Sequence, residues 1–97
     1  MENTGKKWQN ERTRRLFKAI LKLRTTKECA RFFRDLCTIN EIRDLSQRWE
    51  IVLMLLNKIP YREIERKTGA STATITRVAH WFKHGEKGFQ LVLNRLD

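Results

Sequence analysis

A glycine between two short helical segments is the feature that most constrains this chain. Residues 62–68 have the composition of a short helix, Gly69 follows, and Ser71 can cap a second helix at its N-terminus. Glycine accepts the left-handed backbone conformation that a sharp turn needs. Apolar residues on both sides of the turn can pack the two helices together: Ile64, Ala70, Ile75 and Val78. The pattern predicts a helix-turn-helix over residues 60–83, and an ordinary helical hairpin is the alternative.

The rest of the sequence predicts an all-α fold of about six helices. No stretch alternates with period two, and the 97 residues contain 1 proline and 4 glycines. We expect a single domain over residues 1–97, with a flexible, polar N-terminus at residues 1–7. The expected helices are at about 8–23, from a Thr25 or Thr26 N-cap onward, and at about 39–56, 60–67, 72–83 and 87–96. Gly85 is expected to end the fifth helix in a left-handed conformation.

The third helix predicts that two copies of the chain associate. Thr38 and Glu41 can form a capping box at its start, and the helix becomes apolar on every side from Ile51 onward. Such a helix needs cover all around, which a small chain has difficulty providing. We therefore expect a homodimer, with a single compact core as the alternative. The second helix should bury a stripe formed by Cys29, Phe32, Phe33 and Leu36.

The charge of the chain favours a polyanionic partner. Lysine and arginine number 21 against 11 aspartates and glutamates, a net charge of +10. The longest apolar run, residues 51–56, is far shorter than the roughly 20 residues of a membrane span, and no apolar signal region follows the first charges. We expect a cytoplasmic protein in which Cys29 and Cys37 are reduced thiols.

The helix-turn-helix and the charge together predict binding to double-stranded DNA. The N-terminal end of the second helix of such a motif reaches base edges in the major groove, and Arg62 is placed to meet a guanine. The residues expected at the DNA are Arg62, Ser71, Thr72, Ala73, Thr76, Arg77, His80 and Lys83. We expect a transcription regulator, acting as a repressor by obstruction, that reads a pseudo-palindrome with half-sites roughly 34 Å apart.

One position departs from the usual helix-turn-helix pattern. Glu65 lies four residues before the turn glycine, where many such motifs carry alanine against the second helix. A long side chain at this position should point out past the fifth helix and disturb the standard packing.

Other functions receive less support. An RNA-binding or protein-interaction module is the alternative, but RNA readers stack bases on exposed aromatics, and only Trp8, Tyr61 and Trp81 are candidates. His80 and His84 have zinc-ligand spacing, yet the two cysteines lie on another helix, so we expect no metal. Without a glycine-rich phosphate loop or a Ser/His/Asp arrangement, we also expect no enzymatic activity.

Several segments together resemble the Trp repressor superfamily, and most of all its YerC/YecD-type branch. The resemblance covers about residues 8–96 and rests on residues 32–38, 69–77 and 88–93. It implies an intertwined, all-helical homodimer that places two recognition helices in successive major grooves. By position, Arg62 matches an arginine that contacts guanine, and Lys83 matches a lysine near the phosphate backbone. Thr72, Ala73 and Thr76 match residues at the base edges.

The resemblance also implies an effector pocket. Arg48 and Arg77 match the two arginines that sandwich the indole of bound tryptophan, and Thr38 matches a residue beside its amino group. Val78 and Trp81, however, stand where the family's tryptophan-binding member has glycine and serine. These larger side chains should intrude on the pocket, so we expect no cofactor and no dependence on tryptophan. Binding of tryptophan or of another small effector is the alternative.

Overall fold

The computed structural model describes residues 7–96, so most of the predicted N-terminal segment lies outside the described residues. The described part is all-helical, with six helices and no strand, as the sequence predicts. By its internal contacts the chain divides into two compact units, residues 1–39 and 40–97. The prediction of a single domain remains a prediction.

The first helix, α1 (Glu11–Ile20), is shorter at both ends than the predicted 8–23. It starts late because Asn10 and Thr13 form a capping box, in which each side-chain oxygen accepts a hydrogen bond from the other residue's backbone N–H. It ends early because Lys22 and Leu23 donate to carbonyls only three residues back, which tightens the chain into a turn. Trp8 therefore lies outside the helix and meets the edge of the Phe17 ring.

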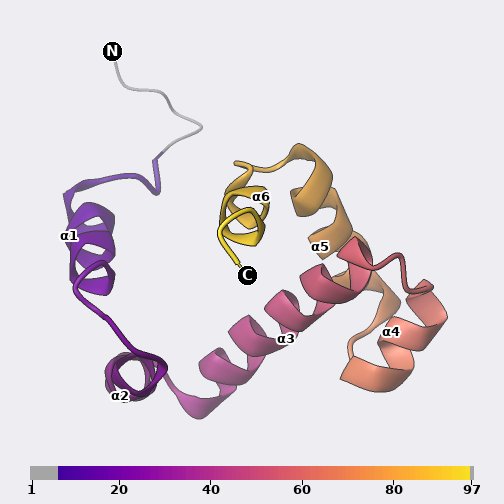
Figure 1. Ribbon diagram of the computed structural model, residues 1–97, viewed down its shortest axis with the longest axis horizontal. Helices are drawn as coiled ribbons and strands as arrows, with labels where there is room; N and C mark the ends of the chain where they lie inside the picture. Colours follow the sequence, from indigo (N-terminus) through magenta and orange to yellow (C-terminus); the bar gives the residue numbers. More distant parts are fainter. Residues whose placement is uncertain (1–6, 97) are drawn as a thin grey trace. The chain divides into compact units, whose positions relative to one another are not determined.

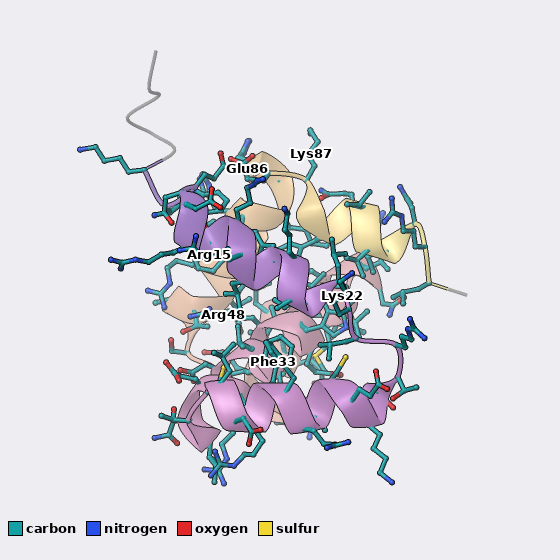
Figure 2. All side chains as sticks on the ribbon, turned by 90° about the vertical axis from the view of Figure 1, so that its left-hand side faces the viewer. Arg15, Lys22, Phe33, Arg48, Glu86 and Lys87 are labelled. Atoms are coloured by element: carbon teal, nitrogen blue, oxygen red, sulfur yellow. The ribbon has the colours of Figure 1, made fainter. Side chains whose placement is uncertain are left out.

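The second helix, α2 (Thr26–Leu36), begins as predicted after an N-cap threonine. The Thr25 hydroxyl accepts a hydrogen bond from the Glu28 amide at 3.0 Å, and the Glu28 carboxylate accepts one from the Arg24 amide at 2.8 Å. Phe33 projects from this helix, and its ring meets the Phe32 ring edge to face (Figure 2). The predicted stripe is only partly buried, because Leu36 is 52% exposed.

The remaining helices form the second unit. They are α3 (Ile39–Leu56), which starts at the boundary between the units, α4 (Tyr61–Thr68), α5 (Thr72–His84) and α6 (Gly88–Leu93). In Figure 1, α4 and α5 gather around the C-terminal half of α3. The last helix is shorter than the predicted 87–96, because Arg95 and Leu96 donate to carbonyls three residues back. None of the helices in the described part of the chain is long and apolar enough to cross a membrane.

The core of the second unit joins α3 to the helix-turn-helix. Its buried members are Ile51, Val52, Ile64, Ala70, Ile75 and Val78, with Phe82, Phe89 and Leu93 packed against them in part. The apolar C-terminal half of α3 is thus covered largely by helices of the same chain. Burial is incomplete at its end, because Leu56 is 50% exposed.

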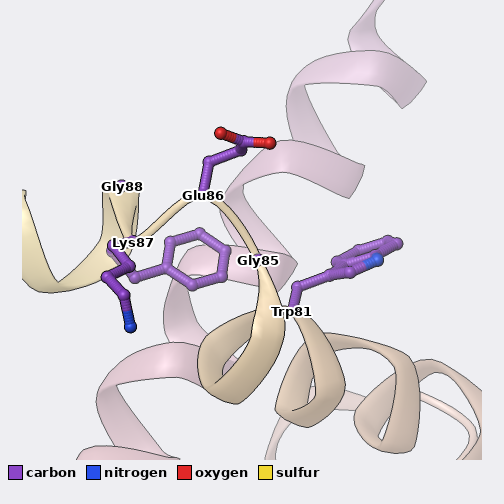
Figure 3. Close-up of a pocket in the computed structure, with 6 residues that line it drawn as sticks. Trp81, Gly85, Glu86, Lys87 and Gly88 are labelled. Atoms are coloured by element: carbon purple, nitrogen blue, oxygen red, sulfur yellow. The ribbon is translucent and has the colours of Figure 1, made fainter. Parts of the chain in front are cut away.

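Gly85 ends α5 for a different reason from the one predicted. Its φ of −83° and ψ of −149° lie outside the left-handed region. A Cβ atom at this position would lie 2.5 Å from the carbonyl oxygen of Trp81, which accepts a hydrogen bond from the Gly85 amide at 2.8 Å. Glycine is needed here because the backbone passes so close to Trp81 (Figure 3). The left-handed conformation falls instead on Lys87, with φ 63°.

Candidate nucleic-acid interface

The turn between α4 and α5 has the predicted helix-turn-helix geometry. Gly69 ends α4 with φ 75° and donates its amide hydrogen to the Glu65 carbonyl at 2.9 Å. The Thr68 hydroxyl donates to the Ile64 carbonyl and accepts from the Ala70 amide, so it braces the turn from inside. Ser71 then caps α5 by accepting a hydrogen bond from the Thr74 amide. The turn is therefore fixed by backbone conformation and by side-chain hydrogen bonds.

The third helix also holds the turn in place, a contact that the sequence did not reveal. The Gln47 side-chain amide donates a hydrogen bond to the Thr68 carbonyl at 3.1 Å, in a partly buried position. Gln47 lies 21 residues before its acceptor. Because no local pattern links the two positions, only the packing of α3 on the motif could identify the contact.

All eight residues predicted at the DNA are exposed: Arg62, Ser71, Thr72, Ala73, Thr76, Arg77, His80 and Lys83. At 100° per residue, the six of them that lie on α5 fall within a sector of about 140° on the helical wheel. The buried residues Ile75, Val78 and Ala79 occupy the other side of α5. The fold thus brings the α5 residues together on one solvent-facing surface, which we call the recognition face.

Glu65 lies differently from the prediction that it points out past the fifth helix. Its carboxylate accepts a hydrogen bond from the hydroxyl of Thr72, the first residue of α5. The side chain is half-buried, and the packing of α4 on α5 through Ile64 and Ile75 is preserved. The predicted disturbance is therefore wrong, because the carboxylate finds a polar partner across the turn.

The charges beside the recognition face are partly paired. Arg66 forms an ion pair and a hydrogen bond with Glu63 on the same helix. The hydrogen bond from Arg66 lowers the pKa of the Glu63 carboxyl, and Glu63 in turn raises the pKa of Arg66. One α4 arginine thus has its charge offset by a neighbour.

The two histidines of α5 lie close together on the exposed side of the helix. The ring centres of His80 and His84 are 5.0 Å apart. Within residues 7–96, no group of three or more histidines, cysteines, aspartates or glutamates is arranged to hold a metal ion. Cys29 and Cys37 are half-buried free thiols in the other unit.

Three residues of the predicted effector pocket line one hollow of about 190 Å³ in the second unit. These are Arg48, Arg77 and Trp81, and Asp44, Gln47 and Thr74 complete the lining. The Arg48 guanidinium lies over the Trp81 ring, 5.8 Å from its centre. Val78 packs wholly inside the core and is absent from this lining, and Thr38 belongs to the other unit. Asp44 lies four residues before Arg48 on α3, a spacing that could have identified it from the sequence, whereas Gln47 is adjacent to Arg48 and has no such signal.

Trp81 also borders a second hollow, of about 370 Å³. The rest of its lining comes from the connection after α5, which supplies Gly85, Glu86 and Lys87, and from the first two residues of α6, Gly88 and Phe89. Figure 3 shows the Trp81 indole on one side of this hollow and the connection on the other, and Figure 2 shows Glu86 and Lys87 at the same connection. The Trp81 side chain therefore contributes to the lining of both hollows.

With this geometry in view, the match to a known family is decisive. Residues 11–97 match the model of the family described as Trp repressor protein.

This chain belongs to the Trp repressor family.

Individual relatives agree with this membership. The chain is 49% identical over 81 residues to the uncharacterised protein YerC of Bacillus subtilis strain 168, which covers 84% of this chain and 78% of YerC. Among solved structures, it is similar to a TrpR-like protein from Eubacterium eligens ATCC 27750, with TM-score 0.88, 46% identity and coverage of 93% of both chains. It is also similar to a candidate Trp repressor from Staphylococcus aureus, with TM-score 0.88, 40% identity and coverage of 97% of this chain and 94% of that one.

Membership in the Trp repressor family fixes the general function. The family consists of DNA-binding regulators and not of enzymes, and the resemblance of this chain to its YerC-type members is confirmed. The protein is therefore a DNA-binding regulator of transcription.

Proposed function

We propose that this Trp repressor family member is a homodimeric repressor in the cytoplasm that reads a pseudo-palindromic operator in double-stranded DNA. The observation that carries this proposal is the recognition face, where Thr72, Ala73 and Thr76 stand exposed at the N-terminal end of α5. Small side chains allow this end of the helix to approach base edges closely. Arg62 and Lys83 add positive charge on α4 and at the far end of α5.

The net charge of +10 supports the same partner. Lysine and arginine side chains that neutralise phosphates release counterions from DNA, so the affinity should fall steeply as salt is raised. Phosphate contacts position the protein, whereas base contacts select the sequence. We assign Lys83 to the first role and Arg62 to the second.

Exposed apolar side chains support association into a homodimer. On α1, α3 and α6 they include Phe17 at 48%, Leu45 at 46% and Leu91 at 52% exposed. The largest single exposure is that of Leu21, at 82%. Burial of exposed apolar side chains is the main favourable contribution to most protein association. A second copy of the chain would cover these residues, and a dimer with two recognition helices would meet half-sites about one helical turn, roughly 34 Å, apart.

The Trp81 indole supports regulation that does not depend on tryptophan. The resemblance implies that Arg48 and Arg77 would sandwich the indole of a bound tryptophan. Here the chain's own indole lies against Arg48. The hollow of about 190 Å³ between these residues is also below the range of roughly 300–1,000 Å³ for ligand sites. A free tryptophan would compete with Trp81 for the side of the Arg48 guanidinium that the indole occupies.

The proposal is tested by in-vitro selection of bound duplexes from a random library, with and without tryptophan. We expect one enriched palindrome that is the same in both conditions. Enrichment only with tryptophan would contradict the proposed independence. Failure to enrich any duplex, together with binding to a structured RNA competitor, would favour the RNA-binding alternative, and no specific binding to either would favour a protein-interaction module.

A further inference from the structure

The hydrogen bond between Glu65 and Thr72 joins α4 to the recognition face. Thr72 is exposed at the first position of α5, and Glu65 is half-buried on α4, seven residues earlier. A carboxylate has only acceptor oxygens, so the Thr72 hydroxyl is the donor in this pair. The single hydrogen of that hydroxyl therefore points toward Glu65 and is not available to DNA bound at the recognition face.

This direction limits what Thr72 can recognise. A hydroxyl has one donor hydrogen and two acceptor lone pairs. With its hydrogen committed to Glu65, Thr72 offers a base edge an acceptor and a methyl group. The carboxylate beside it adds a further acceptor. The start of the recognition face thus carries two neighbouring acceptors and no free side-chain donor from this pair.

Two neighbouring acceptors favour a base that presents an amino group. In the major groove, cytosine presents its N4 amino group, which can donate a hydrogen bond to glutamate or aspartate. Guanine presents two acceptors there, O6 and N7. We propose that Glu65 and Thr72 together read a cytosine in each half-site of the operator, and that guanine at that position is rejected. This inference rests on the proposed function, because it needs double-stranded DNA at the recognition face.

A carboxylate at this position should lower the affinity of the protein for DNA, and recognition of a base by Glu65 would explain why it is present. Glu65 places a negative charge beside a surface that must approach phosphates, in a chain whose net charge is +10. Like charges repel, so Glu65 weakens binding to every sequence and is compensated only where a cytosine amino group meets it. Glu65 thereby increases discrimination at the expense of general affinity.

A purely structural role predicts different behaviour. A negative charge near the N-terminus of α5 stabilises the helix through its dipole, and the hydrogen bond to Thr72 stabilises the turn. If these were the only roles, replacing Glu65 would lower thermal stability without changing which base is preferred. Base preference is therefore the readout that separates the two roles.

The experiment is in-vitro selection with the wild-type protein and four variants: Glu65→Gln, Thr72→Val, Thr72→Ser and, as control, Glu63→Gln. Glu65→Gln keeps a carbonyl oxygen for Thr72 but replaces the second acceptor by an amino donor. Glu63→Gln makes the same change of charge on the same helix, at a residue paired with Arg66. Thermal unfolding of each protein is followed in parallel.

We expect the wild-type protein to select cytosine at one position of each half-site, with about tenfold preference over guanine. Glu65→Gln should lose this preference in favour of adenine, which glutamine pairs with through N6 and N7, and should bind random duplexes more tightly. Thr72→Val should weaken the preference for cytosine, and Thr72→Ser should keep it because the hydroxyl is retained. Glu63→Gln should leave every preferred base unchanged.

Two failures are distinguishable. An enriched wild-type operator in which no position responds to Glu65→Gln would overturn this inference and leave the proposed function intact. If the wild-type protein enriches no duplex, the proposed function fails and this inference fails with it.

Discussion

The guanidinium of Arg48 on α3 lies 5.8 Å from the centre of the Trp81 ring on α5. This cation–π contact puts the protein's own indole against an arginine that, by resemblance, would hold a tryptophan ligand. We therefore expect no saturable heat in isothermal titration of the protein with tryptophan. Micromolar binding would contradict this expectation.

The buried face of α5 should dominate the stability of the helix-turn-helix. Ile75 is 0% exposed, so Ile75→Ala is expected to lower the free energy of unfolding by about 2–5 kcal/mol. The matched control is Thr76→Ala, one residue along and exposed, which should change it by no more than about 0.5 kcal/mol. Denaturant unfolding at fixed protein concentration measures both, and equal losses would show that α5 is not packed as described.

Substitutions at the two left-handed positions that follow α3 and α4 should change the stability of the protein in opposite directions. Gly69 has φ 75° and open space around its missing Cβ, so Gly69→Ala should cost about 1–2 kcal/mol from backbone conformation alone. Lys58 has φ 58°, so Lys58→Gly should stabilise by about 0.5–1 kcal/mol, after the greater chain entropy of glycine is subtracted. Thermal unfolding tests the pair, and a loss of stability in Lys58→Gly would show that its side chain makes a compensating contact.

Arg62 and Lys83 should affect DNA binding in different ways. Arg62→Ala is expected to cost about 1–3 kcal/mol on the selected operator and to relax the preference at one base position. Lys83→Ala should weaken all duplexes similarly and reduce the slope of log affinity against log salt by about 1. Fluorescence anisotropy on operator and random duplexes distinguishes them. An equal loss on both duplexes for Arg62→Ala, or a selective loss for Lys83→Ala, would refute the assigned roles.

The proposed dimer can be tested on the exposed part of α3. Leu45 is 46% exposed, and a charge there should be costly to bury against a second copy, so Leu45→Glu is expected to shift the protein toward monomer. Ser46→Glu, at the neighbouring exposed position, should have little effect. Sedimentation equilibrium should give the wild-type protein twice the chain mass of 11.7 kDa. A wild-type protein that stays monomeric at micromolar concentration would refute the dimer.

The helices and the turn could be predicted from the amino-acid sequence, because they depend on residues that are neighbours along the chain. Gly69 and Ser71 act on the backbone within a few positions, and the apolar spacing of α5 separates its buried side from its exposed side. The six predicted DNA-facing residues on α5 are exposed for the same reason. The predicted start of α1 at about residue 8 is wrong for a reason that is also local, because Asn10 and Thr13 cap the helix.

The contacts between separate helices could not be predicted in this way and are seen only in the folded protein. The Gln47 side chain donates a hydrogen bond to the Thr68 carbonyl, and the Glu65 carboxylate accepts one from the Thr72 hydroxyl. The Arg48 guanidinium lies over the Trp81 ring. Each contact depends on how two helices cross and on which rotamer a long side chain adopts, and neither is encoded by spacing along the chain. For the same reason the sequence suggests that Glu65 disturbs the helix packing, whereas in the folded protein its carboxylate accepts a hydrogen bond from Thr72 on α5.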